Sequence, residues 1–210
     1  MVPKLAAAFL LSSVLHAAEP QALFNGKDLA GWTFDSIDPK IEAKSVWSVA
    51  DGILICKGRP PGLMRTEKEF SNYELTVEWR WAPDGKSGNS GVLIHASKPK
   101  ELFVWPKSIE VQLAADNAGD FWTIGETLTV AGGEPQGNGR RWVKKAGSTE
   151  KPPGEWNTMR IRCEGAKLTT WVNGTLMNEA TGLSATKGAI CLQSEDKEVH
   201  FRKVELKPIE

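Results

Sequence analysis

Three extended stretches of this sequence carry polar side chains opposite an apolar set. The alternation is strict in residues 73–81, and similar patterns occupy residues 91–95 and 109–113. Side chains two positions apart share one face of a strand. If the three strands are neighbours, five polar side chains gather on one sheet surface: Glu78, Arg80, His95, Glu110 and Gln112.

These residue types are suited to acid–base chemistry. Glu78 and Glu110 are a candidate pair of carboxyl groups, which glycosidases place on either side of the bond that they cleave. His95 is the favoured acid or base, because an unperturbed imidazole titrates near neutrality. These residues also have explanations that do not involve function. A lone histidine on a strand often lies at the surface or has its hydrogen bonds satisfied within the protein, and Arg80 could simply neutralise Glu78 or Glu110.

Side chains near these strands supply candidate groups for binding a ligand. Nine tryptophans among 210 residues is a high count, and Trp offers a large apolar ring with one polar atom. Trp47, Trp79 and Trp171 lie in strand patterns and are expected to pack in the core. Residues 89–91 are equally well explained as a turn whose side chains bind their own backbone. The substrate-binding candidates are Asn89, Ser90, Gln112, Trp105, Trp122, Trp142 and Gln193.

The elements that must position these residues are short strands. Asp51-Gly52 and Asn173-Gly174 are hairpin signals between apolar runs. Many such strands, without a convincing amphipathic helix, predict an all-β fold, a two-sheet antiparallel jelly-roll sandwich. Residues 114–149 are irregular and rich in Gly, Asp, Asn and aromatic residues, and loops this long are usually functional or mobile.

Residues 1–18 have the features of a secretory signal. Lys4 precedes an apolar run over residues 5–15, which ends in His-Ala-Ala. The run is too short to span a bilayer, which needs about 20 residues, and no cysteine follows it as a lipid anchor. We expect export to the periplasm or the medium, no membrane association after signal removal, and a single domain over residues 19–210.

Composition excludes several classes of protein. The formal net charge is zero and no basic stripe occurs, so nucleic acid is not an expected partner. The sequence has no Gly-x-Ser-x-Gly elbow, phosphate loop or dinucleotide motif. Three cysteines permit one disulfide at most and demand none. No cofactor is required, although a divalent cation such as calcium is compatible with the sequence.

Nine motifs in order resemble the 3-keto-disaccharide hydrolase family. They are LFNGKDLAGW at 23–32, WxVxDGxL at 47–54, NYELxxEWR at 72–80, NSGV at 89–92, IEVQ at 109–112, GEWN at 154–157, VNG at 172–174, GxIxLQ at 188–193 and VxFR at 199–202. The resemblance runs from about residue 22 to the end. It implies a concanavalin A-like jelly roll and bacterial export. It also implies a small carbohydrate partner, a glycoside whose sugar carries a ketone at carbon 3.

A 3-keto sugar permits cleavage by elimination, because the ketone acidifies the hydrogen on carbon 2. A base removes that hydrogen, the enolate expels the group on carbon 1, and water then adds to the enone. Glu78, His95 or Glu110 could be the base, and Arg80 or a bound cation could stabilise the enolate. The alternative is a non-catalytic carbohydrate-binding module. The segment at residues 119–122 departs from the family pattern, which leaves the exact sugar open.

Overall fold

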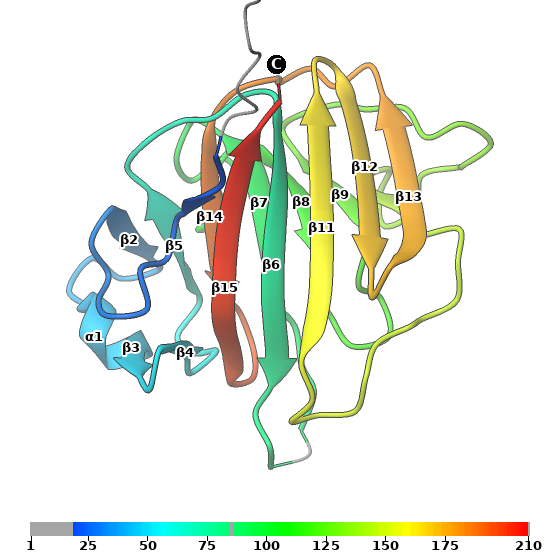
Figure 1. The fold of residues 1–210 in the computed structure, drawn as a ribbon. Helices are drawn as coiled ribbons and strands as arrows, with labels where there is room; N and C mark the ends of the chain where they lie inside the picture. The colour runs from blue at the N-terminus through cyan, green and yellow to red at the C-terminus, as the bar shows by residue number, and fades with distance from the viewer. Residues whose placement is uncertain (1–18, 85, 210) are drawn as a thin grey trace, which may run out of the picture.

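The computed structural model describes residues 19–84 and 86–209, and these form two antiparallel β-sheets packed face to face (Figure 1). Sheet A has the order β13-β12-β11-β6-β15-β4-β3, with β1 paired to β15, and sheet B has the order β10-β9-β8-β7-β14-β5-β2. The predicted two-sheet jelly-roll sandwich is confirmed. The predicted signal at residues 1–18 lies outside the described residues.

The strands are short, and one helical turn, α1 (Ala43–Val46), precedes β3. Those of sheet A are β1 (Gln21–Ala22), β3 (Trp47–Ala50), β4 (Ile53–Cys56), β6 (Tyr73–Trp81), β11 (Asn157–Glu164), β12 (Lys167–Val172), β13 (Thr175–Thr181) and β15 (Val199–Pro208). Those of sheet B are β2 (Trp32–Ser36), β5 (Gly62–Thr66), β7 (Gly91–Ala96), β8 (Ser108–Gln112), β9 (Phe121–Ile124), β10 (Arg141–Trp142) and β14 (Ala189–Ser194).

The hairpin turns confirm the two signals in the sequence. Asp51 and Gly52 both have positive φ, at 52° and 74°, and join β3 to β4. Asn173 and Gly174 do the same between β12 and β13, at 49° and 84°. Two consecutive residues with positive φ match the twist of the flanking strands, which is why Asn or Asp followed by Gly is favoured there.

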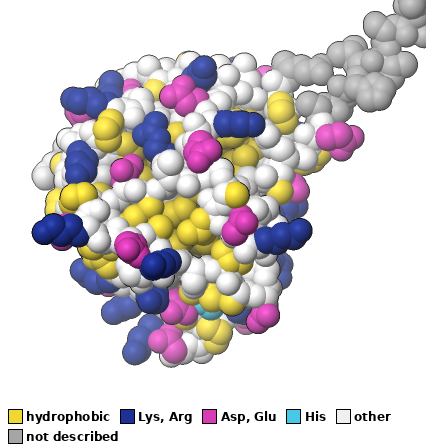
Figure 2. Space-filling view, turned by 90° about the vertical axis from the view of Figure 1, so that its left-hand side faces the viewer, with side chains coloured by type: hydrophobic (Ala, Val, Ile, Leu, Met, Phe, Trp, Pro, Cys, Tyr) yellow, Lys and Arg dark blue, Asp and Glu magenta, His cyan; other side chains and the backbone are white. Residues whose placement is uncertain are grey.

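The core lies between the two sheets. Alternate residues of each sheet face it, and its largest fully buried side chains include Trp47, Trp79, Trp81, Tyr73 and Phe121. A second, smaller apolar cluster lies on the other face of sheet B and includes Leu93 and Trp105. The side carrying β2, β3 and α1 shows hydrophobic side chains between charged ones (Figure 2).

The region of residues 114–149 is more ordered than its composition indicates. It adds β9 and the short β10 to the edge of sheet B. It also contacts β13 at the edge of sheet A, where Thr129 pairs with Thr181 and Lys145 N donates to the Met177 carbonyl oxygen. Cys56, Cys163 and Cys191 are free and buried. Among the described residues, none of the helical structure has the length or apolarity needed to cross a bilayer.

Candidate active site

The outer face of sheet B carries a row of side chains with Glu110 at its centre. Antiparallel pairing sets Glu110 on β8 opposite Leu93 on β7 and opposite Trp122 on β9. Its chain neighbours Ile109 and Val111 belong to the core between the sheets, so alternation directs Glu110 outward. An apolar side chain and an aromatic one therefore flank this carboxyl group.

Gly91 leaves the space that the Glu110 side chain occupies. A Cβ atom on Gly91 would lie 2.4 Å from Glu110 Oε1 and 2.7 Å from Gln193 Oε1. The strands β8 and β14, which carry these two residues, pair with β7 on either side. The glycine is thus required by close approach, and it lets the carboxyl and the amide meet above the backbone of β7.

Glu110 forms part of the wall of a hollow of about 180 Å³. Trp105 and Trp122 contribute flat surfaces, and Arg140 and Glu195 contribute charge. The remaining lining residues are Asn89, Leu102, Gln112 and Ile124. This combination of rings and polar groups suits a ligand with flat apolar faces and a polar rim.

Buried polar atoms without hydrogen-bond partners gather around this hollow. They are Asn89 Oδ1, Glu110 Oε1, Trp122 Nε1 and Gln193 Oε1. Most buried polar atoms in folded proteins are paired, and each unpaired one costs about 1–3 kcal/mol. Three acceptors and one donor grouped in this way complement a ligand that is rich in hydroxyl groups.

The electrostatics of the hollow favour a protonated carboxyl group. Burial raises the pKa of Glu110 to about 8, and the nearby charge of Glu195 adds to the effect, while Gln193 and Arg140 oppose it. Burial also raises the pKa of Glu195, with a contribution from the charge of Asp196. Two carboxyl groups with raised pKa values in one hollow are suited to proton transfer.

The ring of Trp122 is held from the loop that precedes β10. The guanidinium groups of Arg140 and Arg141 each lie 5.9 Å from the centre of this ring. Arg141 is itself fixed, because its Nε donates to Asp120 at 2.8 Å and its Nη2 to Asn117 at 2.7 Å. Arg140 remains directed at the hollow, and its guanidinium can stabilise negative charge there.

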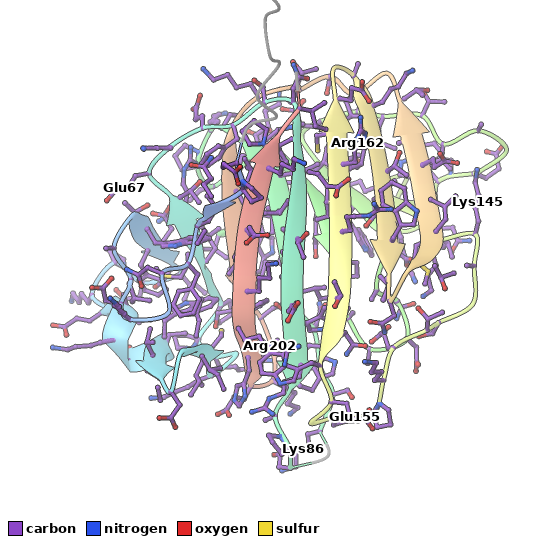
Figure 3. The ribbon with its side chains drawn as sticks, in the orientation of Figure 1. Glu67, Lys86, Lys145, Glu155, Arg162 and Arg202 are labelled. Carbon is purple, nitrogen blue, oxygen red and sulfur yellow. The ribbon has the colours of Figure 1, made fainter. Side chains whose placement is uncertain are left out.

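Glu78 and Arg80 do not belong to this hollow, so the prediction that five polar residues gather on one surface is wrong. Both lie on β6 in the middle of sheet A, which pairs with β11 and β15 and not with β7. Glu78 accepts a hydrogen bond from Arg202, which Figure 3 labels on β15. Arg80 donates to His200 Nδ1 at 3.2 Å. The chain changes sheets between β6 and β7, which alternation alone does not reveal.

His95, the predicted acid or base, is also placed elsewhere. The pairing of β7 with β14 has an irregularity beside it, and His95 has a positive φ of 52°. Such a bulge interrupts the alternation of side chains. The ring is fully buried, lies edge-on to Tyr73, and has Nδ1 2.9 Å from the Ala185 carbonyl oxygen. Burial lowers its pKa to about 4, so the imidazole is neutral at pH 7.

The other predicted binding residues divide into two groups. Asn89, Gln112, Trp105 and Trp122 line the hollow, and Gln193 lies beside Glu110. Ser90 is buried and donates to the Gln193 carbonyl oxygen at 3.0 Å, and Trp142 lines a separate hollow.

The tryptophans that were expected to pack also divide. Trp47 and Trp79 are in the core. Trp171 instead lies on the outer face of sheet A, with the Arg160 guanidinium 3.8 Å from its ring centre.

Arg140 and Glu195 also line the hollow, although neither is among the residues predicted from the sequence. Glu195 lies two positions after Gln193. The alternation that assigns Gln193 to the outer face therefore also indicates that Glu195 lies on that face, where it lines the hollow. Arg140 follows a Gly-rich loop and belongs to no periodic pattern. Within residues 19–84 and 86–209, no group of three His, Cys, Asp or Glu is arranged as a metal site.

Fold and site together define a carbohydrate-active jelly roll with a polar hollow on one sheet. The chain belongs to the 3-keto-alpha-glucoside-1,2-lyase-like domain family, whose model matches residues 19–207. Membership in this family supports a glycoside-cleaving function and leaves the particular sugar open. No curated protein matches the chain.

Solved structures share the fold at low sequence identity. A candidate glycosyl hydrolase from Parabacteroides distasonis is 21% identical, with a TM-score of 0.66 over 91% of this chain and 94% of that one. The carbohydrate binding module CBM66 from Bacillus subtilis is 12% identical, with a TM-score of 0.61 over 84% and 95% of the two chains. The beta-glucanase of Bacillus licheniformis is 14% identical, with a TM-score of 0.56 over 93% and 100%.

Proposed function

We propose that this protein cleaves 3-keto glycosides by elimination across carbons 1 and 2 of the sugar, with Glu110 as the base. The observation that carries the proposal is the state of Glu110. The residue is 6% exposed, and its carboxyl group has one buried oxygen without a partner and a pKa raised to about 8. A base with a raised pKa suits a weakly acidic carbon-bound proton. Glu110 acts in its ionised form, which becomes the major form as the pH rises through about 8.

Glu110 takes the proton from carbon 2, and the electron pair of that C–H bond passes into the adjacent ketone as an enolate. The enolate collapses to a double bond between carbons 1 and 2, and the bond from carbon 1 to the leaving oxygen breaks. Glu195, whose pKa is also raised, supplies the proton that the leaving oxygen takes. Addition of water across the new double bond then gives the free 3-keto hexose.

The remaining groups hold the sugar and the developing charge. Arg140 lies at the hollow, and its guanidinium stabilises the enolate oxygen more strongly than the neutral ketone, which lowers the barrier. Trp122 offers an apolar face to the ring of the sugar. Asn89 Oδ1 and Gln193 Oε1 have no hydrogen-bond partner within the part of the protein that the structure describes. They can therefore accept hydrogen bonds from the hydroxyl groups of the sugar.

The test compares two glutamates on central strands of the two sheets. Glu110→Gln should lower turnover of a 3-keto glucoside by about 10³-fold or more, because a general base contributes about 10²–10⁴-fold. Glu78→Gln removes a carboxylate that is paired with Arg202 on sheet A, away from the hollow. This variant should retain turnover within about twofold. Equal loss in both variants, or none in Glu110→Gln, contradicts the assignment.

The competing function is a non-catalytic carbohydrate-binding module, favoured by the two tryptophans that line the hollow. Sugar binding by the wild-type protein without turnover of any 3-keto glycoside would support it. We also propose export to the periplasm or the medium, supported by the composition of residues 1–18. Detection of the mature chain outside the cytoplasm, beginning near residue 19, tests this.

A further inference from the structure

A second hollow of about 480 Å³ adjoins the first one. The two share Asn89, Trp105 and Glu195 in their walls. The second is completed by Arg59, Pro61, Phe103 and Asp196. Since the two spaces share these three wall residues, a substrate with its sugar against Glu110 would extend its leaving group into the second hollow.

One wall of the second hollow is a tight turn. Leu102 N donates to Trp105 O at 3.2 Å and Trp105 N donates to Leu102 O at 3.0 Å, which closes the turn around Phe103 and Val104. Trp105 and Val104 are buried in the small apolar cluster on the outer face of sheet B. The turn is therefore anchored by its buried members, and Phe103 projects from it.

Phe103 is unfavourable in two respects. Its φ is 60°, in the left-handed region that Gly and Asn adopt readily and bulky residues rarely do. Its side chain is 59% exposed, and the neighbouring Leu102 and Ile37 are 41% and 46% exposed. A strained and exposed aromatic residue beside a candidate active site points to a role in binding.

We propose that Phe103 forms the apolar wall of a leaving-group subsite, and that this subsite takes an aromatic aglycone. The inference rests on the proposed function and adds the class of leaving group. The charged residues Arg59 and Asp196 lie 3.5 Å apart and pair with each other. An aromatic ring would lie between Phe103 and Trp105 in this hollow and would remove the exposed face of Phe103 from water.

The test uses two substrates that differ only in the leaving group, phenyl 3-keto-glucoside and methyl 3-keto-glucoside. Phe103→Asn should lower kcat/KM for the phenyl substrate by about five- to tenfold, as expected for one lost aromatic contact, and for the methyl substrate by less than about twofold. The Tm should stay equal or rise, because Asn suits a positive φ. A loss of activity together with unchanged or higher stability excludes simple unfolding.

Lys100→Asn is the matched control. Lys100 lies in the same loop with a φ of 54°, is exposed, and does not line the second hollow. The substitution should relieve the same kind of backbone strain and leave kcat/KM for both substrates unchanged. Equal effects of Phe103→Asn on both substrates, or none on either, overturn the subsite and leave the proposed function standing.

If the wild-type protein cleaves neither substrate, the proposed function fails and the subsite is tested by binding. Phenyl glucoside without the ketone then serves as the probe in calorimetry. Weaker binding by Phe103→Asn than by the wild-type protein, again by about five- to tenfold, supports the subsite. Equal affinity, or no measurable binding by either protein, overturns it.

Discussion

A buried carboxyl group with an unpaired oxygen destabilises the fold that contains it, and Glu110 is such a group. The hydroxyl groups of a sugar are suited to pair with it and with the neighbouring oxygens of Asn89 and Gln193. Binding sites commonly keep strained or unsatisfied groups that other parts of the protein compensate. The raised pKa of Glu110 is the measurable consequence of this arrangement.

The pH dependence of stability should reveal Glu110 in the absence of any substrate. The folded chain holds this proton more tightly than the unfolded chain, since the pKa rises from 4.5 to about 8. The resulting stabilisation is fully present below pH 4.5 and is lost as the pH rises through about 8. Glu110→Gln should therefore gain stability relative to the wild-type protein over this range, on the order of 5 kcal/mol.

Denaturant unfolding at pH 5, 7 and 9 measures this difference. His95 titrates in the opposite sense, because burial lowers its pKa to about 4, but it is present in both proteins and cancels in the comparison. Parallel stability profiles for the two proteins would show that Glu110 is solvated in the folded state, contrary to the structure.

At the scale of single residues, alternation predicted which side of a strand a residue faces but not which sheet holds the strand. Glu110, Gln112 and Gln193 were placed correctly for this reason. Glu78 failed because β6 belongs to sheet A. His95 failed because a bulge and a positive φ turned its ring toward Tyr73, and no residue type in the sequence signals that bulge.

At the scale of elements, the site depends on how closely β8 and β14 approach each other above β7. Gly91 allows this approach, because a Cβ atom at this position would clash with Glu110 Oε1 and Gln193 Oε1. The loop before β10 adds Arg140 and holds Trp122 from the other side. The central strands were predictable from their periodicity, whereas the loop contribution was not, because it follows no repeating pattern.

Gly91→Ala should therefore displace the Glu110 carboxyl group and lower kcat by about tenfold or more, since displacements near 1 Å at a reacting group have effects of about 10²-fold. Its Tm should fall only moderately, because the atoms that must shift all belong to the side chains of Glu110 and Gln193 and none to the backbone. Gly147→Ala is the matched control, since a Cβ atom there meets nothing within 4 Å. Full activity in Gly91→Ala, measured beside this control, would refute the packing argument.

At the scale of the whole molecule, the two sheets bury a large apolar core between them, which stabilises the domain without covalent links. The fold class followed from the turn signals and the alternation, because both are local properties of the chain. The division of strands between the sheets could not be predicted in the same way. It depends on contacts between segments far apart in the sequence, such as β6 with β15.

The cysteines provide a test of this packing. All three are free and buried, and burial raises the pKa of each thiol to about 12. Thiol reagents should label the folded protein very slowly and label three groups after unfolding in denaturant. The Tm should be the same with and without reductant. Rapid labelling of the folded protein, or a drop in Tm with reductant, would contradict the packing.

The proposed elimination is tested most directly by the fate of the hydrogen on carbon 2. The wild-type protein is incubated with a 3-keto glucoside in D₂O, and the released 3-keto hexose is analysed by mass spectrometry and NMR. Enzyme-free product held for the same time corrects for spontaneous exchange. Removal of this proton by Glu110 and later addition of water predict deuterium on carbon 2 of the product, and neither cleavage nor exchange with Glu110→Gln. Product that keeps its original hydrogen on carbon 2 would mean direct hydrolysis and would contradict the account.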